Sequence, residues 1–244
     1  MTKSPEGIDL VVLCGGRGVR MRPTTDRIPK GLVPVAGRPI IDHVLDSYLK
    51  QGIQRAFLCV GYKGDSIRSH IESRNLSSEI IFSDMGETAS MLERLHVLTD
   101  QLSDTFAVAY CDTFIDLNFT DMLQAHKKGD YKATMLTAHI QSPFGIVDIN
   151  EDGNVISFIE KPVLNYFVGC FLMNRVVLEN LNKNLVTMPD GAGIVQLFQQ
   201  QVRDRTLNSY QNDGLRITFN TETERNEAEK KMNRYFTLNE EAAK

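Results

Sequence analysis

A glycine-rich, strongly basic stretch occupies residues 13–30, immediately after a short apolar run. It contains three glycines, Gly15, Gly16 and Gly18, and ends in a proline followed by Lys30. Between positions 17 and 38 the chain has six basic residues and a single acid. A glycine-rich turn lets backbone N–H groups approach an anion closely, and fixed cations beside it neutralise further negative charge. The stretch therefore predicts a cradle for a polyphosphate.

The composition is that of an ordinary globular protein. The 244 residues are 42% hydrophobic and 24% charged, which is typical of one soluble domain. Because the formal net charge is -4, the basic stretch is a local exception, which favours a small anionic ligand over nucleic acid. No apolar run approaches the ~20 residues needed to span a bilayer. The N-terminus lacks the apolar core of a signal peptide, and the four cysteines lack metal-binding spacing. We therefore expect a cytoplasmic protein with reduced thiols and no nucleic-acid or membrane partner.

Strands and helices alternate in the first half of the chain. Apolar runs predict strands at 8–14, 56–60, 79–82 and 106–110, and helical spacing predicts helices at 39–51, 67–73 and 88–102. Such alternation indicates a parallel sheet with right-handed crossovers, in which ligands bind beyond the carboxyl ends of the strands. The glycine-rich stretch and Asp112 both fall at such ends. We therefore expect them to meet in space.

The second half has a different pattern. Closely spaced strands are predicted at 133–139, 145–149, 155–160 and 168–173, with a hairpin turn at 150–154. They indicate antiparallel additions that form the other side of a cleft. Helices are predicted at 175–182, 193–203 and 221–235, short strands at 207–211 and 215–219, and a frayed tail at 239–244. We expect a single compact unit.

Three kinds of phosphate-binding loop carry glycines in a similar pattern. A P-loop requires Gly-Lys followed by Ser or Thr, which this stretch lacks. A dinucleotide-binding loop requires a third glycine where this chain has Met21. The third kind is the Gly-Gly-x-Gly-x-Arg…Pro-Lys signature of sugar-phosphate nucleotidyltransferases, and residues 15–30 match it closely.

The chain resembles that family, which includes glucose-1-phosphate cytidylyltransferase, thymidylyltransferase and the mannose-1-phosphate guanylyltransferases. The resemblance covers most of the first 175 residues. The matching segments beyond the loop are 35–39, 60–64, 111–116, 144–149 and 158–162. It implies a three-layer αβα nucleotide-binding fold with a mostly parallel, mixed sheet and an antiparallel acceptor-side extension. It also implies one nucleotidyltransferase domain, 1–244, with a nucleotide-binding half (1–130) and an acceptor-binding half (131–244).

The implied reaction joins a nucleoside triphosphate to a phosphorylated acceptor and releases pyrophosphate. Since the acceptor phosphate is itself the nucleophile, the chemistry requires positioning of two anions and neutralisation of the departing pyrophosphate. Arg20 suits a forked contact with the triphosphate, and Lys30 suits a point-charge contact. The resemblance implies that the segment 86–90 contacts the base of the nucleotide. The alternative interpretation of this segment is an ordinary helix start capped by Thr88. The expected nucleotide-binding residues are Leu13, Gly15, Gly16, Gly18, Glu87 and Thr88.

The expected cofactor is Mg²⁺, held by Asp112 at a strand end, because a carboxylate together with phosphate oxygens makes the usual magnesium site. A helix N-cap is the alternative role for Asp112. The family often has a second metal-binding aspartate where this chain has Asn220. An amide oxygen can coordinate a hard cation but compensates less charge. Glu222 is then a candidate to replace the missing carboxylate.

On the acceptor side, the resemblance implies that Lys161 holds the acceptor phosphate and that Glu160 accepts from its hydroxyl or amine groups. Gly145 and Gly169 are the other expected acceptor-binding residues. The family commonly has a polar residue where this chain has Val168, which cannot hydrogen-bond a sugar hydroxyl. The acceptor is therefore either a sugar 1-phosphate or a small non-sugar phosphate or phosphonate. The expected catalytic residues are Arg20, Lys30, Asp112 and Lys161.

Two classes of function remain open at this point. The first is an Mg²⁺-dependent nucleotidyltransferase, with CTP as the preferred nucleotide because the segments 60–64 and 158–162 resemble the cytidylyltransferase branch most. The second is a catalytically silent nucleotide-binding subunit, which the amide at Asn220 motivates. Relatives often assemble as dimers to hexamers, so a homo-oligomer is among the expected states.

Overall fold

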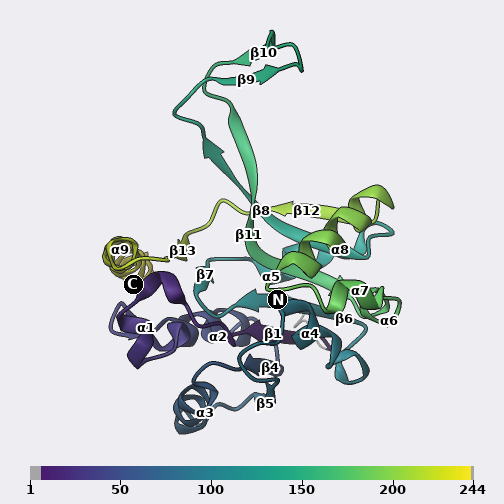
Figure 1. Ribbon diagram of the computed structural model, residues 1–244. Helices are drawn as coiled ribbons and strands as arrows, with labels where there is room; N and C mark the ends of the chain where they lie inside the picture. Colours follow the sequence, from purple (N-terminus) through teal and green to yellow (C-terminus); the bar gives the residue numbers. More distant parts are fainter. Residues whose placement is uncertain (1–6, 243–244) are drawn as a thin grey trace.

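The computed structural model describes residues 7–242, which form one mixed seven-stranded sheet with helices on both faces (Figure 1). The strand order is β12-β8-β11-β6-β1-β4-β5, and within it β11 is antiparallel to both of its neighbours while the other pairs are parallel. The α/β fold and its mostly parallel sheet, predicted from the sequence, are thereby confirmed. The strands of this sheet are β1 Asp9–Leu13, β4 Arg55–Val60, β5 Glu79–Asp84, β6 Thr105–Tyr110, β8 Ala133–Gln141, β11 Val163–Asn174 and β12 Leu207–Gln211.

The helices lie over the two faces of the sheet and in the connections around it. They are α1 Thr24–Arg27, α2 Ile40–Leu49, α3 Gly64–Ser73, α4 Met91–His96, α5 Phe119–Lys127, α6 Val176–Glu179, α7 Lys183–Val186, α8 Ala192–Arg203 and α9 Glu222–Ala242. Within residues 7–242, 3₁₀ turns occur at Val19–Met21, Lys30–Leu32 and Thr99–Gln101. Three further strand pairs lie outside the main sheet, namely β2 Pro34–Val35 with β3 Arg38–Pro39, β7 Thr113–Ile115 with β13 Arg216–Thr218, and β9 Ile146–Ile149 with β10 Val155–Ile159.

Two apolar clusters explain why the central strands are continuously hydrophobic. Side chains alternate across a strand, so Leu10 and Val12 of β1 enter one cluster while Val11 and Leu13 enter the other. The first cluster is covered by α2, α3, α5 and α9, and the second by α4, α6 and α8. The sheet is therefore the middle layer of three.

Several predicted boundaries are wrong, each for a local reason. The helix expected at 88–102 begins at Met91, because Ser90 and Glu93 form a capping box, and it ends at His96 before a 3₁₀ turn. The helix expected at 175–182 is the short α6. The tail predicted to fray continues as helix to Ala242 at the end of α9, and 243–244 lie outside the described residues.

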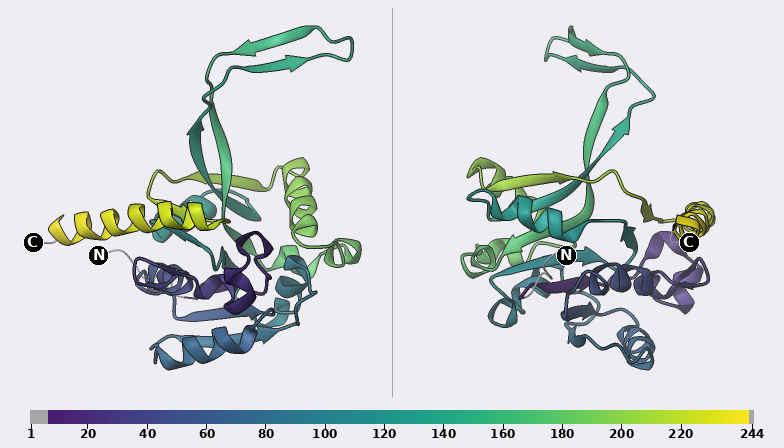
Figure 2. Two further views of the ribbon diagram at one scale, coloured as in Figure 1. Left: turned by 60° about the vertical axis from the view of Figure 1, so that its left-hand side comes forward. Right: turned by 180° about the vertical axis from the view of Figure 1, so that it is seen from behind.

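A long hairpin projects from the body of the molecule (Figures 1 and 2). The outer ends of β8 and β11 pair from Phe167↔Thr137 to Val163↔Gln141, and the small hairpin of β9 and β10 lies beyond them. We call residues 139–166 the arm. Ser142 is the single buried residue within it.

The thiols of Cys14, Cys59, Cys111 and Cys170 are free and buried, as expected for structural cysteines. Burial raises the pKa of Cys59 and of Cys170 to about 12. Among the described residues, no helix is both long enough and apolar enough to cross a membrane.

The burial of His126 predicts that the free energy of unfolding depends on pH. It is buried between Thr134, at 2.8 Å from Nδ1, and Asn174, at 2.9 Å from Nε2, and burial lowers the pKa of His126 below its usual 6.5. The unfolded chain therefore binds a proton before the folded one does. The free energy of unfolding should therefore be unaffected by His126 above about pH 6.5 and should fall as the pH drops below that value. Urea unfolding of the wild type and of His126→Gln measures this slope.

The variant should lose part of the acid-dependent decrease in the urea midpoint. His43, which is also buried with a lowered pKa, retains its share of that decrease. The exposed His96, changed to Gln, serves as the control. Equal slopes for wild type and His126→Gln would contradict the assignment.

Candidate functional site

The glycine-rich loop follows β1 and is fixed to the neighbouring strand β4. Cys14 N–H donates to the Cys59 carbonyl (3.0 Å), and Tyr62 N–H donates to the Gly15 carbonyl (3.0 Å). Gly18 has φ +60°, the left-handed region that favours glycine. A Cβ at Gly15 would lie 2.5 Å from the guanidinium carbon of Arg94. Packing against Arg94 therefore favours glycine at Gly15, and the backbone conformation favours it at Gly18.

The loop presents unpaired backbone donors. None of the N–H groups of residues 15–18 donates a hydrogen bond to another described residue. Successive free N–H groups in a tight turn form a concave anion-binding surface. The loop lies at the carboxyl end of β1, where the order of the sheet places β4 on one side and β6 on the other. Such a switch point is where open α/β sheets bind ligands.

Lys30 lies beside this loop and contacts two oxygens from distant parts of the chain. Its Nζ is 2.5 Å from Asp112 Oδ2 and 3.2 Å from Asn220 Oδ1. Asp112 follows β6, and Asn220 follows β13, which pairs with β7. The side chains of Lys30 and Asp112 are only 11% and 23% exposed. The predicted meeting of the loop with Asp112 is thus observed.

The other basic residues of the stretch divide into two groups. Arg17 forms an ion pair with Glu87, and Arg20 is exposed and has no ion-pair partner among the described residues. Arg22 pairs with Asp26, and Arg38 pairs with Asp46, outside the pocket. Of the basic residues of this stretch, Arg17, Arg20 and Lys30 therefore line the pocket.

These groups line a cavity of about 650 Å³. The pocket brings together nearly all the residues predicted for the triphosphate side. The members of that set found in its lining are Leu13, Gly15, Gly16, Gly18, Arg20, Lys30, Glu87, Asp112 and Asn220. Thr88 is exposed and does not line the pocket, and the helix cap that was its alternative role belongs to Ser90.

The donor atoms around Lys30 fit a magnesium ion that receives most of its ligands from a nucleotide. The described residues include no cluster of three or more His, Cys, Asp or Glu side chains suited to a metal ion. Asp112 and Asn220 nevertheless direct one oxygen each at the same point, the Lys30 ammonium. Glu222 does not replace the missing carboxylate, because it accepts from Thr24 Oγ1 and pairs with Arg225. Those contacts also lower the pKa of Glu222.

The residues predicted for the acceptor lie elsewhere. Gly145, Glu160 and Lys161 are on the arm, and none of them lines the pocket. They lie close to one another, since a Cβ at Gly145 would be 3.1 Å from Glu160 Oε2, and Lys161 Nζ is 3.8 Å from Glu160 Oε1. Gly169 lines a second, largely apolar groove that adjoins the first pocket. The structure therefore separates the two predicted halves of the site.

Arg94 is a pocket residue that was not predicted from the sequence. It is 4% exposed, and its guanidinium donates to the carbonyls of Val60, Gly86 and Ala89. It pairs with no carboxylate among the described residues, so its positive charge at the back of the pocket is not neutralised locally. The sequence gives little signal for it, because it is a single arginine in the helical run of α4.

Arg94→Ala is expected to lower the free energy of unfolding by about 3 kcal/mol, because it removes three hydrogen bonds from a buried guanidinium to backbone carbonyls. Arg94→Lys should lose less, since an ammonium keeps the charge but not the planar fork. Urea unfolding of both variants measures the difference. A loss below about 1 kcal/mol for Arg94→Ala would contradict the proposed role.

A basic, glycine-rich loop and a strand-end carboxylate at the switch point of an αβα sheet define the class of nucleotide-binding proteins. The chain belongs to the nucleotidyl transferase family, whose pattern it matches over residues 10–215. The membership predicted from the loop and its matching segments is thereby confirmed.

Two curated relatives illustrate the similarity. The chain is 31% identical over 186 residues to the mannose-1-phosphate guanylyltransferase catalytic subunit beta of Drosophila pseudoobscura pseudoobscura, covering 72% of this chain and 50% of that protein. It is 25% identical over 234 residues to the UTP–glucose-1-phosphate uridylyltransferase AglF of Haloferax volcanii, covering 91% and 95%. The chain thus spans about half the length of the first relative and nearly all of the second.

Two solved structures share the fold. HddC from Yersinia pseudotuberculosis, complexed with GMP-PN, has a TM-score of 0.70 at 20% identity, over 92% of this chain and 99% of that one. A putative glucose-1-phosphate thymidylyltransferase from Bacillus anthracis has a TM-score of 0.72 at 18% identity, over 91% and 94%.

Proposed function

We propose that this protein is a nucleotidyltransferase that transfers a nucleoside monophosphate from a nucleoside triphosphate to a sugar 1-phosphate and releases pyrophosphate. The main support is the pocket in which four free loop N–H groups, Arg20 and Lys30 converge next to Asp112. This arrangement suits a substrate that carries several negative charges in a row. Membership of the nucleotidyl transferase family supports the same reaction class.

The residues act by position and charge. The loop N–H groups and Arg20 hold the β- and γ-phosphates, and Lys30 neutralises the charge that builds on the departing pyrophosphate. No side-chain nucleophile is required, because the acceptor phosphate attacks the α-phosphorus. Arg94, fixed behind Gly15, adds a positive field that does not need to reorganise during the reaction.

We propose Mg²⁺ as the cofactor, with Asp112 as its protein ligand and Asn220 as a weaker one. When bound, the ion would neutralise phosphate charge and orient the triphosphate. The convergence of the two oxygens on Lys30 Nζ supports this assignment. The single carboxylate means that the nucleotide supplies most of the ligands.

The proposal also specifies which nucleotide and which acceptor the protein uses. CTP is the nucleotide predicted from the sequence, whereas the two curated relatives are named for guanylyl and uridylyl transfer. A sugar 1-phosphate is the proposed acceptor because both relatives are named for one. A small non-sugar phosphate remains the alternative that Val168 favours. Val168 lines the apolar groove, where it offers no hydrogen bond to a hydroxyl.

A pyrophosphate-release panel tests the proposal directly. CTP, UTP, dTTP and GTP are each combined with glucose 1-phosphate, mannose 1-phosphate and phosphocholine, with and without Mg²⁺. Release with at least one sugar phosphate supports the proposed function, and release with phosphocholine alone selects the alternative acceptor. Thermal stabilisation by a nucleotide without any release would instead identify a silent binding subunit, which is the second candidate that Asn220 motivates.

We also propose a cytoplasmic location. The four buried free thiols support a reducing compartment. Fractionation of cells that express the tagged chain checks the location.

A further inference from the structure

The arm carries most of the exposed hydrophobic surface of the described residues. Of nineteen large hydrophobic side chains that are exposed there, twelve lie between Ile140 and Tyr166. Phe144 and Phe158 are 74% and 63% exposed. A two-stranded hairpin alone in water is marginally stable, and apolar patches of this kind mark interaction sites. The arm therefore requires a partner surface.

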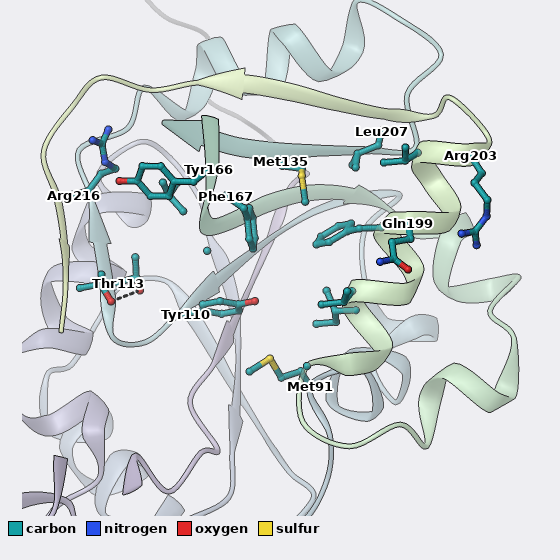
Figure 3. A pocket seen from close by; sticks show the side chains of 18 residues that line it. Met91, Tyr110, Thr113, Met135, Tyr166, Phe167, Gln199, Arg203, Leu207 and Arg216 are labelled. Carbon is teal, nitrogen blue, oxygen red and sulfur yellow. Dashed lines mark hydrogen bonds between the residues drawn. The ribbon is translucent and has the colours of Figure 1, made fainter. Parts of the chain in front are cut away.

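A matching surface lies beside the nucleotide pocket. The groove between β11 and α8 has a volume of about 860 Å³ and is lined mostly by apolar side chains (Figure 3). Phe167, Tyr110 and Met135 point into it from the sheet. On α8, Val195 and Val202 line the same groove and are 53% and 62% exposed. They are two further members of the nineteen exposed hydrophobic side chains.

The charges of the two surfaces are complementary. The arm holds four acidic residues against one Lys or Arg, Lys161, whereas the groove is lined by Arg203 and Arg216 and by no acidic residue. Arg203 has no ion-pair partner among the described residues. The acidic residues of the arm are Asp148, Glu151, Asp152 and Glu160.

The hydrogen bonds at the root of the arm extend the β8–β11 ladder out of the sheet, and the arm projects away from the body of its own chain (Figures 1 and 2). The β8–β11 ladder continues to Val163↔Gln141 and is extended by Ser142 N–H to the Pro162 carbonyl (2.9 Å) and by Gln141 Nε2 to the Lys161 carbonyl. Tyr166 and Phe167, at that root, also form a wall of the groove. The arm is thus a two-stranded ladder that continues the sheet outward, and it can enter a second copy in the extended form that Figures 1 and 2 show.

We propose that two copies of this chain exchange arms, so that the arm of each copy fills the groove of the other. The groove and the nucleotide pocket share Met91, Tyr110, Thr113 and Thr218. A seated arm therefore brings Glu160 and Lys161 of one copy beside the nucleotide pocket of its partner. This role for the arm in the reaction rests on the proposed function, but the exchange itself does not.

The oligomeric state tests the exchange without any activity. Light scattering after size-exclusion chromatography should give twice the 27.5 kDa of the chain. Phe144→Asp/Phe158→Asp on the arm and Val195→Asp/Val202→Asp on the groove should each give a monomer. Val97→Asp, at a 49% exposed valine outside both surfaces, should stay dimeric. A monomeric wild type, or a dimer that neither double variant affects, would overturn the proposal.

Mixing the two double variants separates arm exchange from other dimers. The groove variant has an intact arm, and the arm variant has an intact groove. An equimolar mixture should therefore form a heterodimer that neither variant forms alone. If the two arms merely paired with each other, the groove variant, whose arm is intact, would dimerise on its own, which would overturn the exchange. Circular dichroism and the melting temperature show that each variant is folded.

A second mixture tests the shared active site once pyrophosphate release is established. Lys30→Ala damages the pocket and Lys161→Ala damages the arm, so each variant alone should be inactive. In a random mixture, about one site in four combines an intact pocket with an intact arm and should recover that share of wild-type activity. Absence of recovery, with both variants inactive and dimeric, would contradict a shared site. Failure of all substrates in the wild type would instead refute the proposed function and leave the light-scattering result intact.

Discussion

Replacing Lys30 by alanine is expected to lower kcat/KM for pyrophosphate release by about a thousandfold. Lys30 is the cation that contacts both Asp112 and Asn220, and its side chain is only 11% exposed. In such a partly buried pocket its charge is weakly screened, so its loss removes a strong interaction with the phosphates. The measurement is steady-state kinetics with the best substrate pair from the panel.

Arg27→Ala is the matched control for this prediction. Arg27 belongs to the same basic stretch, is exposed, and does not line the pocket. It should keep wild-type kinetics within about twofold, because a surface charge outside the pocket contributes little. Near wild-type activity of Lys30→Ala, in a variant that melts as the wild type does, would refute the assignment of Lys30.

Asp112→Asn should reduce activity by a similar factor and should also change the response to magnesium. It removes the carboxylate of the proposed metal site while it keeps the size of the side chain. The concentration of Mg²⁺ that gives half-maximal activity should rise by at least about tenfold. Titration of pyrophosphate release with Mg²⁺ measures both effects.

Asp116→Asn provides the control, because Asp116 lies four residues further on, is exposed, and does not line the pocket. Its Mg²⁺ response should match that of the wild type. Asn220→Asp should shift the response in the opposite direction, since it adds a second carboxylate at the position that contacts Lys30. An unchanged Mg²⁺ response in Asp112→Asn would show that Asp112 serves only to hold Lys30.

The nucleotide side of the site was predictable because its signals are local. The loop needs glycine at specific positions, and continuous apolar runs such as β1 mark strands that are buried on both faces. The order of alternating strands and helices then places the loop and Asp112 at the same edge. No comparable pattern marks Arg94, whose importance depends on three carbonyls that come together only in the folded chain.

The acceptor side was less predictable for a different reason. The motif around Glu160 and Lys161 predicts what these residues bind, but the direction in which a hairpin leaves the body depends on long-range packing.

The helix α5 and the strand β7 were also not predicted from the sequence. β7 is short, and it is a strand because it pairs with β13, about a hundred residues later. The strand propensity of the local sequence does not predict a pairing between segments that are so far apart.

The contact between Thr24 and Glu222 has a consequence for how the protein is made. Thr24 Oγ1 donates to the Glu222 carboxylate across 198 positions, and β7 pairs with β13 across about a hundred. Asn220 reaches Lys30 from the same late segment. Because the chain is synthesised from its N-terminus, the central sheet can begin to form on the ribosome while these contacts are still missing. The loop that opens the sequence therefore acquires its final geometry late in synthesis, so a nascent chain should become competent for nucleotide binding only after residues 216–222 emerge.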